Sequence, residues 1–238
     1  MKMQVLVALI AGLLLAAEAP KDEQAKNEAE KLFRNMEEKL AKATTLELVF
    51  EGKLEVEEGN QSRTIRREGS LLLAEGNKVR LEIKEGKKAE SMWRLMVSDG
   101  TRMKVVDIGS DPQVQTAPQS GNSELLAWVT RAGILLPQMP LPDVKAADGK
   151  DRYSVSDFRL GNKEKVGDRE TQRLEYQLVV NGHPGTFAVT VWLDSKTDLP
   201  VKRVVTFRMP GYGATLTEGK MKLTLNGKVD AKKFELPK

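Results

Sequence analysis

The sequence predicts a mainly β protein with some helix (α+β), built on one highly curved antiparallel sheet. Three observations support this fold class. Residues 46–106 form five successive runs in which apolar and polar side chains alternate, the pattern of strands with one buried and one solvated face. Gly- and Asn-containing turn sequences separate the runs, and similar runs resume at about residue 153. Two helical patterns accompany them, at residues 22–43 and from Glu124 to about Leu136.

The first run is the clearest strand. One face carries only apolar side chains, namely Leu46, Leu48, Phe50, Leu54 and Val56. At about 3.3 Å per residue, this strand would be roughly 36 Å long, above the usual length. Asp99-Gly100 later in the stretch is typical of a tight hairpin turn.

The remaining runs define further apolar rows. Those of the first half are Ile65, Gly69, Leu71 and Leu73; Val79, Leu81 and Ile83; Trp93, Leu95 and Val97; and Met103 and Val105. Those of the second half are Leu174, Tyr176, Leu178 and Val180; Phe187, Val189, Val191 and Leu193; Val201, Arg203, Val205, Phe207 and Met209; and Ala214, Leu216, Met221, Leu223 and Leu225. Arg203 is out of character in its row. We expect about ten strands in a single domain spanning residues 20–238.

The helix at residues 22–43 is amphipathic. Its apolar stripe consists of Ala29, Leu32, Phe33, Met36, Leu40 and Ala43. A single stripe must pack on something, most simply the apolar face of the first five strands.

Residues 108–149 predict a long loop that carries one short helix. Leu125, Leu126, Trp128 and Val129 make this helix apolar on nearly every side, so we expect it to be buried. Loops of this length are uncommon unless they are functional.

Residues 1–19 are typical of a secretory signal peptide. Lys2 supplies the positive start, an apolar run follows, and Ala17-Glu18-Ala19 fits a small-x-small cleavage site. Pro20 is unfavourable directly after that site, so cleavage after Ala16 or Ala17 is an alternative. A membrane anchor is the alternative interpretation of the same run.

The composition excludes several functional classes. The net charge of +4 is small and scattered, and aromatic residues make up 5%, which argues against nucleic-acid binding. The absence of cysteine removes disulfides, thiol nucleophiles and thiolate metal sites. The one histidine, His183, lies in a predicted turn, and the common hydrolase and phosphate-binding motifs are absent. We therefore expect no enzyme activity, no metal and no cofactor.

Three stretches resemble the periplasmic outer-membrane lipoprotein carrier family, whose fold is called LolA-like. Residues 95–102 (Leu-Met-Val-Ser-Asp-Gly-Thr-Arg) resemble the central hairpin of that family. Residues 187–201, with Trp192-Leu193-Asp194 and Leu199-Pro200, resemble a strand-turn-strand of its relatives. Residues 226–237 resemble the family's ending, in which a short turn precedes Phe and Pro.

The resemblance implies an unclosed antiparallel half-barrel whose concave side is plugged by the N-terminal helix and the short loop helix. It also implies a soluble periplasmic protein that shields the acyl chains of lipoproteins or lipids for transport to the outer membrane. Inner-membrane donor and outer-membrane acceptor proteins are the implied partners. The alternative is a LolA-like sensor or interaction module of the cell envelope that binds lipidated ligands.

The expected ligand-binding residues are the apolar rows and the loop helix. They are Leu48, Phe50, Leu71, Leu73, Leu81, Ile83, Trp93, Leu95, Val97, Met103, Val105, Leu125, Trp128, Val129, Tyr176, Leu178, Phe187, Val189 and Val191. The three tryptophans, Trp93, Trp128 and Trp192, fit either core positions or ligand contacts, and periodicity favours the core.

The chain departs from the family at one position. Family members carry an arginine just after the second strand, whose hydrogen bonds to the plug help to hold it closed. The matching position here is Glu75, followed by Gly76.

Overall fold

The structure is a computed structural model that describes residues 21–86, 91–107, 109–119, 121–134, 152–182 and 185–237. Its helices are α1 (Lys21–Ala41), α2 (Gly121–Arg131) and the short 3-10 helix η1 (Ala231–Phe234). Its strands are β1 (Thr45–Glu58), β2 (Gln61–Ala74), β3 (Lys78–Glu85), β4 (Ser91–Asp99), β5 (Arg102–Asp107), β6 (Gln113–Thr116), β7 (Tyr153–Val166), β8 (Arg169–Val180), β9 (Thr186–Asp194), β10 (Pro200–Met209) and β11 (Tyr212–Leu225). The predicted signal peptide and His183 lie outside the described residues.

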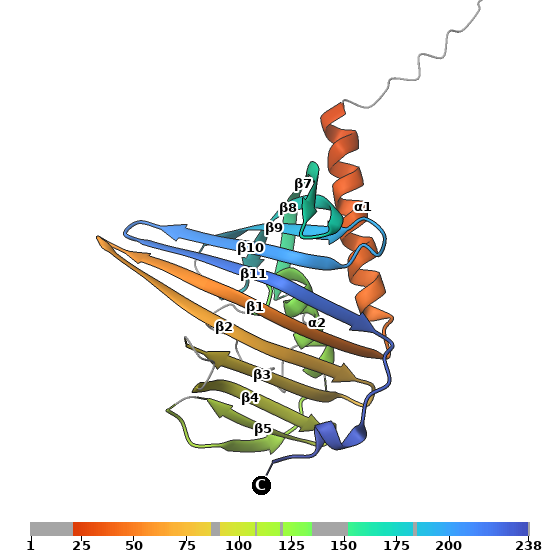
Figure 1. The fold of residues 1–238 in the computed structure, drawn as a ribbon, viewed down its shortest axis with the longest axis vertical. Helices are drawn as coiled ribbons and strands as arrows, with labels where there is room; N and C mark the ends of the chain where they lie inside the picture. The colour runs from red at the N-terminus through yellow and green to blue at the C-terminus, as the bar shows by residue number, and fades with distance from the viewer. Residues whose placement is uncertain are drawn as a thin grey trace, which may run out of the picture.

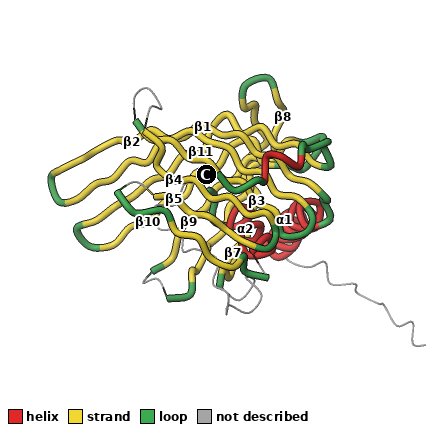
Figure 2. Tube along the Cα trace, turned by 90° about the horizontal axis from the view of Figure 1, so that it is seen from below, coloured by secondary structure: helices red, strands yellow, loops and turns green. Residues whose placement is uncertain are grey.

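All eleven strands form one sheet in the order β6-β5-β4-β3-β2-β1-β11-β10-β9-β8-β7. Every neighbouring pair is antiparallel, and the pairing of β1 with β11 joins the two halves of the chain. Strands β6 and β7 form the two edges, so the sheet is not closed into a barrel. Figure 1 shows this fan of strands, and Figure 2 shows α1 and α2 together on one side of the curved sheet. The predicted α+β fold with an unclosed, highly curved sheet is confirmed.

Alternation along most strands gives the sheet one mainly apolar and one mainly polar face. In β3, Val79, Leu81 and Ile83 are buried while the residues between them are half-buried. We call the face that α1 and α2 cover the concave face, and the opposite one the convex face. Because directly opposed residues of antiparallel strands point to the same side, the register extends this assignment from strand to strand.

Helix α1 packs on the second half of the sheet, and not on the first five strands as the sequence suggested. It contacts β7, β8 and α2. The ring of Phe33 lies 5.1 Å from that of Phe158 on β7 and 4.9 Å from that of Tyr176 on β8. Aromatic partners on those two strands, distant in sequence, therefore decide where the helix docks.

The stretch predicted as a loop before α2 contains an additional strand. Strand β6 pairs with β5, with Lys104 opposite Val114. It is only four residues long and lies at the edge of the sheet, where Val114 is exposed, so alternation gives little indication of it.

Helix α2 begins and ends earlier than predicted. Its first turn is capped from outside, because the side-chain oxygen of Asn77 accepts a hydrogen bond from the Asn122 N–H at 2.9 Å. It ends at Arg131, since Gly133 adopts a φ of 84° and its N–H bonds back to the Trp128 carbonyl. Leu135 and Leu136 lie outside the described residues.

The C-terminal segment crosses the convex face beside β3–β5 (Figure 1). Phe234 of η1 is buried there. The side chains of Arg80 and Lys104 donate hydrogen bonds to the backbone carbonyls of Lys233 and Pro237, each at 3.1 Å. Among the described residues, no helix is long and apolar enough to cross a membrane.

Candidate functional site

The concave face brings most of the predicted ligand-binding residues into one apolar cluster. The members that lie on the sheet and are buried are Leu48, Phe50, Leu71, Leu73, Leu81, Ile83, Met103, Val105, Tyr176, Leu178, Phe187, Val189 and Val191. Leu125, Trp128 and Val129 of α2 belong to the same cluster and are also buried. The side chains of α2 therefore occupy the face on which a ligand is expected, and ligand binding by these residues stays a prediction.

The placement of Leu95 and Val97 on the concave face is wrong. In the β3–β4 register, Leu81 stands opposite Met96, whereas Leu95 stands opposite Glu82. Strand β4 has apolar residues at both odd- and even-numbered positions. Alternation therefore could not decide which of these two sets of side chains faces the concave side. The pairing with β3 decides it, and a slip of one residue moves every side chain to the other face. The side chain of Trp93 lies outside the described part of the chain.

Val97 is nevertheless fully buried, on the convex side. Its register partners are Arg80 on β3 and Lys104 on β5, and both donate hydrogen bonds to the C-terminal segment. Val97 is thus covered from outside the half-barrel, which separates it from the concave cluster.

A buried ion pair interrupts the apolar concave wall. Arg203 on β10 stands opposite Glu218 on β11, and their side chains approach to 3.3 Å. The two residues are 1% and 0% exposed. Buried charges of this kind persist only when hydrogen bonds compensate for lost hydration.

The compensating groups come from the end of α2. Arg203 donates to the backbone carbonyls of Val129 at 2.7 Å and Thr130 at 3.2 Å. Glu218 accepts a hydrogen bond from the Ile134 N–H. The carbonyls of a helix's last turn have no partner within the helix, so a buried guanidinium is a strong partner for them.

A second set of contacts holds the same helix end. The Tyr176 hydroxyl donates to the Arg131 carbonyl at 2.7 Å. The Arg131 guanidinium donates to Glu37 on α1 at 2.6 Å and to the Tyr153 carbonyl at 2.6 Å. Three consecutive carbonyls of α2, at residues 129–131, are therefore each held by a side chain of the concave face.

Both tyrosines near this helix end stay protonated well above neutral pH. Burial raises the pKa of Tyr153 to about 12. Burial also raises the pKa of Tyr176, more strongly. The Tyr176 hydroxyl is consequently a hydrogen-bond donor at any physiological pH.

Glu75 does not take part in this network. It is exposed, just after β2, and its backbone N–H bonds to the Thr44 carbonyl. The arginine that binds the carbonyls at the end of α2 is instead Arg203, on the other half of the sheet. The sequence signal for it was the single charged residue in an otherwise apolar row, and nothing local identified Glu218 as its partner.

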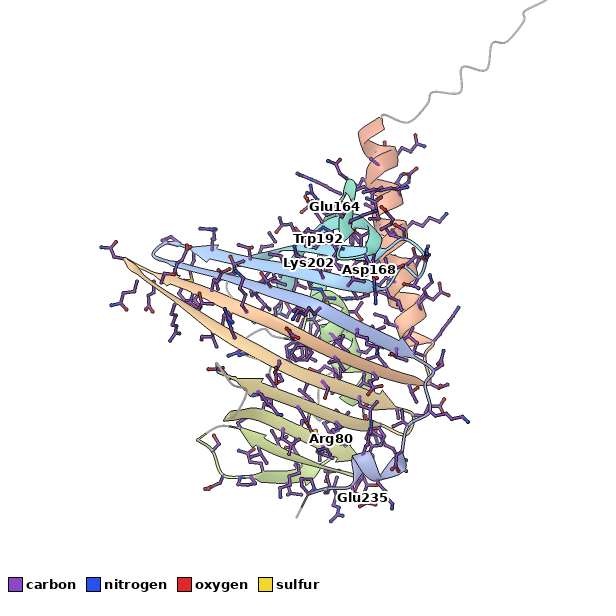
Figure 3. All side chains as sticks on the ribbon, in the orientation of Figure 1. Arg80, Glu164, Asp168, Trp192, Lys202 and Glu235 are labelled. Carbon is purple, nitrogen blue, oxygen red and sulfur yellow. The ribbon has the colours of Figure 1, made fainter. Side chains whose placement is uncertain are left out.

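Trp192 lies on the convex face and belongs neither to the core nor to the concave cluster. Its indole N–H donates to Glu164 at 2.5 Å, and the Lys202 ammonium lies 4.3 Å from the ring centroid (Figure 3). This is a solvent-side cation–π contact.

No family model matches the sequence, and no curated protein does either. Comparison with solved structures finds likenesses that extend over most of the chain. Lipoprotein LppX of Mycobacterium tuberculosis has a TM-score of 0.45 and 10% identity, over 86% of this chain and 98% of that one. LprF of Mycobacterium bovis has a TM-score of 0.44 and 9% identity, over 86% of this chain and 96% of that one. A LolA superfamily protein of Nitrosomonas europaea has a TM-score of 0.34 and 12% identity, over 87% of this chain and 97% of that one.

The neighbours include the LolA superfamily. This is the family that the sequence resemblance named.

Proposed function

We propose that this protein is a carrier of the cell envelope that shields the acyl chains of lipids or lipoproteins on its concave face. The observation that carries the proposal is the pairing of an apolar concave wall with a short helix, α2, that covers it. Trp128 of that helix is buried against the same cluster as Leu48, Leu71 and Leu81. A small helix in a long connection is an element that cargo can displace.

The energetics fit such a role. Each buried methylene contributes about 0.8 kcal/mol, so a chain of about fourteen methylenes costs on the order of 11 kcal/mol to leave in water. Shielding that surface requires only non-directional apolar contacts, which the concave face supplies. Transport to the outer membrane, with donor and acceptor proteins at either end, completes the proposed role.

The test is titration with a fluorescent fatty-acyl probe, together with mass spectrometry of co-purifying lipid. We expect saturable probe binding that Leu81→Asp weakens at least about tenfold, because a charge on the concave wall opposes acyl burial. Leu95→Asp is the matched control, since Leu95 lies on the convex face of the next strand and its exchange should leave probe affinity unchanged. Absence of probe binding and of lipid would refute the carrier role, and a well-folded Leu81→Asp protein with unaltered affinity would place the site elsewhere.

A further inference from the structure

The charged Arg203–Glu218 pair is an unfavourable contact surface for a hydrocarbon chain. Its flanking register pair, Val205 and Leu216, is apolar and buried, as the rest of the concave face is. A buried ion pair is commonly no more stable than an apolar pair of similar volume. Acyl tails by themselves offer no hydrogen-bond partner to these two charges.

The groups that now satisfy the pair have a specific chemistry. Among the described residues they include two peptide carbonyls, from Val129 and Thr130, and one peptide N–H, from Ile134. The Tyr176 hydroxyl donates to the next carbonyl of the same turn. Moreover, Arg203 Nε is buried and has no hydrogen-bond partner within the described part of the chain, so the guanidinium retains capacity for another acceptor.

The contact leaves room only for flat backbone-like groups. A Cβ added to Gly133 would lie 2.9 Å from Arg203 Nη1 and 2.7 Å from a carboxylate oxygen of Glu218. Real Cβ atoms do not come that close, so it is the bare peptide unit that rests on the pair. Ester and amide groups are planar and of the same size.

Displacement of α2 by cargo removes these partners. A buried charged group that loses its hydrogen bonds bears its full desolvation cost. A methylene chain offers no hydrogen-bond acceptor, and an ether oxygen is a weaker acceptor than the peptide carbonyls that it would replace. An acyl ester offers carbonyl acceptors to Arg203 and Tyr176, and an acyl amide offers an N–H to Glu218 as well.

We infer that the Arg203–Glu218 pair, with Tyr176, is the binding site for the carbonyl junction of the cargo, so that the ligand is an acyl ester or amide and not a bare hydrocarbon or an ether lipid. This inference rests on the proposed function. It places the junction at the middle of the concave wall, where the end of α2 now lies, with the chains along the apolar rows on either side.

The experiment compares two competitors for a fluorescent fatty-acyl probe. They are dihexanoylglycerol, which has two ester carbonyls, and dihexylglycerol, its ether counterpart of equal chain length. The wild-type protein should prefer the diester by about 10- to 100-fold, the equivalent of one hydrogen bond to a charged group. The Arg203→Met/Glu218→Leu protein, in which both charges are replaced by apolar side chains, should keep ether binding and lose the preference.

Two further variants keep the result interpretable. Arg203→Met alone leaves Glu218 without its cation and is the variant at risk of misfolding, so circular dichroism is recorded for it and the double variant serves as the decisive one. Arg208→Met is the control, because Arg208 lies on the same strand with its side chain 70% exposed, and it should retain the preference.

Equal wild-type affinity for the two competitors would overturn the inference while leaving the carrier role intact. A preference that survives in the double variant would equally overturn the assignment to this pair. If neither competitor nor the probe binds, the proposed function fails and the inference fails with it.

Discussion

At the scale of single residues, Trp128 is the side chain that decides whether α2 is a plug or a permanent part of the core. It is 3% exposed and stands in the concave cluster. Trp128→Ala should cost the empty protein roughly 3–5 kcal/mol of unfolding free energy, the usual range for a large buried side chain. A plug that cargo must displace lowers apparent affinity, so the same exchange should leave acyl-probe affinity equal or higher.

Melting curves and probe titrations on the wild type and Trp128→Ala measure both quantities. Leu95→Ala controls for apolar truncation on the other face of the sheet. Stability and affinity falling together would mean that Trp128 contacts the ligand directly or is ordinary core, and would contradict displacement of the plug.

At the scale of elements, the two faces of the sheet are covered by different parts of the chain. Helices α1 and α2 cover the concave face, and η1 with the last residues covers β3–β5 on the convex face (Figure 1). Phe234 anchors the latter segment. Phe234→Ala should therefore lower the unfolding free energy by about 3 kcal/mol without changing acyl-probe affinity, because the concave face is untouched.

Hydrogen exchange at the amides of β3–β5 locates the effect, since local opening of that region should become easier. Lys232→Ala, an exposed exchange in the same 3-10 helix, is the control and should be neutral. Loss of probe affinity in Phe234→Ala would show that the two faces are not independent.

At the scale of the whole molecule, we propose that the chain is exported and that cleavage occurs near residues 16–19. The grounds are Lys2, the apolar run after it and the small residues Ala17 and Ala19. N-terminal sequencing of the protein from the soluble envelope fraction should find a chain that starts at residues 17–20. A chain that still begins at Met1 and remains in the inner membrane would contradict both export and the soluble carrier role.

The sequence by itself determined the features that depend on local alternation and composition. The buried faces of β1 and β3 follow from strict alternation, because burial of one face imposes period two on the residues. The apolar stripe of α1 and the burial of Trp128 follow in the same way from helical period and hydrophobicity. These features added up to the correct fold class and to most of the concave cluster.

Only the tertiary structure decided features that depend on partners distant in the chain. Strand β4 is apolar at both parities, so its pairing with β3 chose Met96 over Val97 for the concave face. The start of α2 is set by the Asn77 side chain, and its end is held by Arg203, 73 and 74 residues away from the carbonyls it binds. In the sequence, Arg203 is a charged residue in an apolar row and has no local explanation. The fold explains it, because the carboxylate of Glu218 and the end of α2 lie beside it. Strand register and buried ion pairs depend on residues that are distant in the sequence, so the periodic pattern of one segment does not predict them.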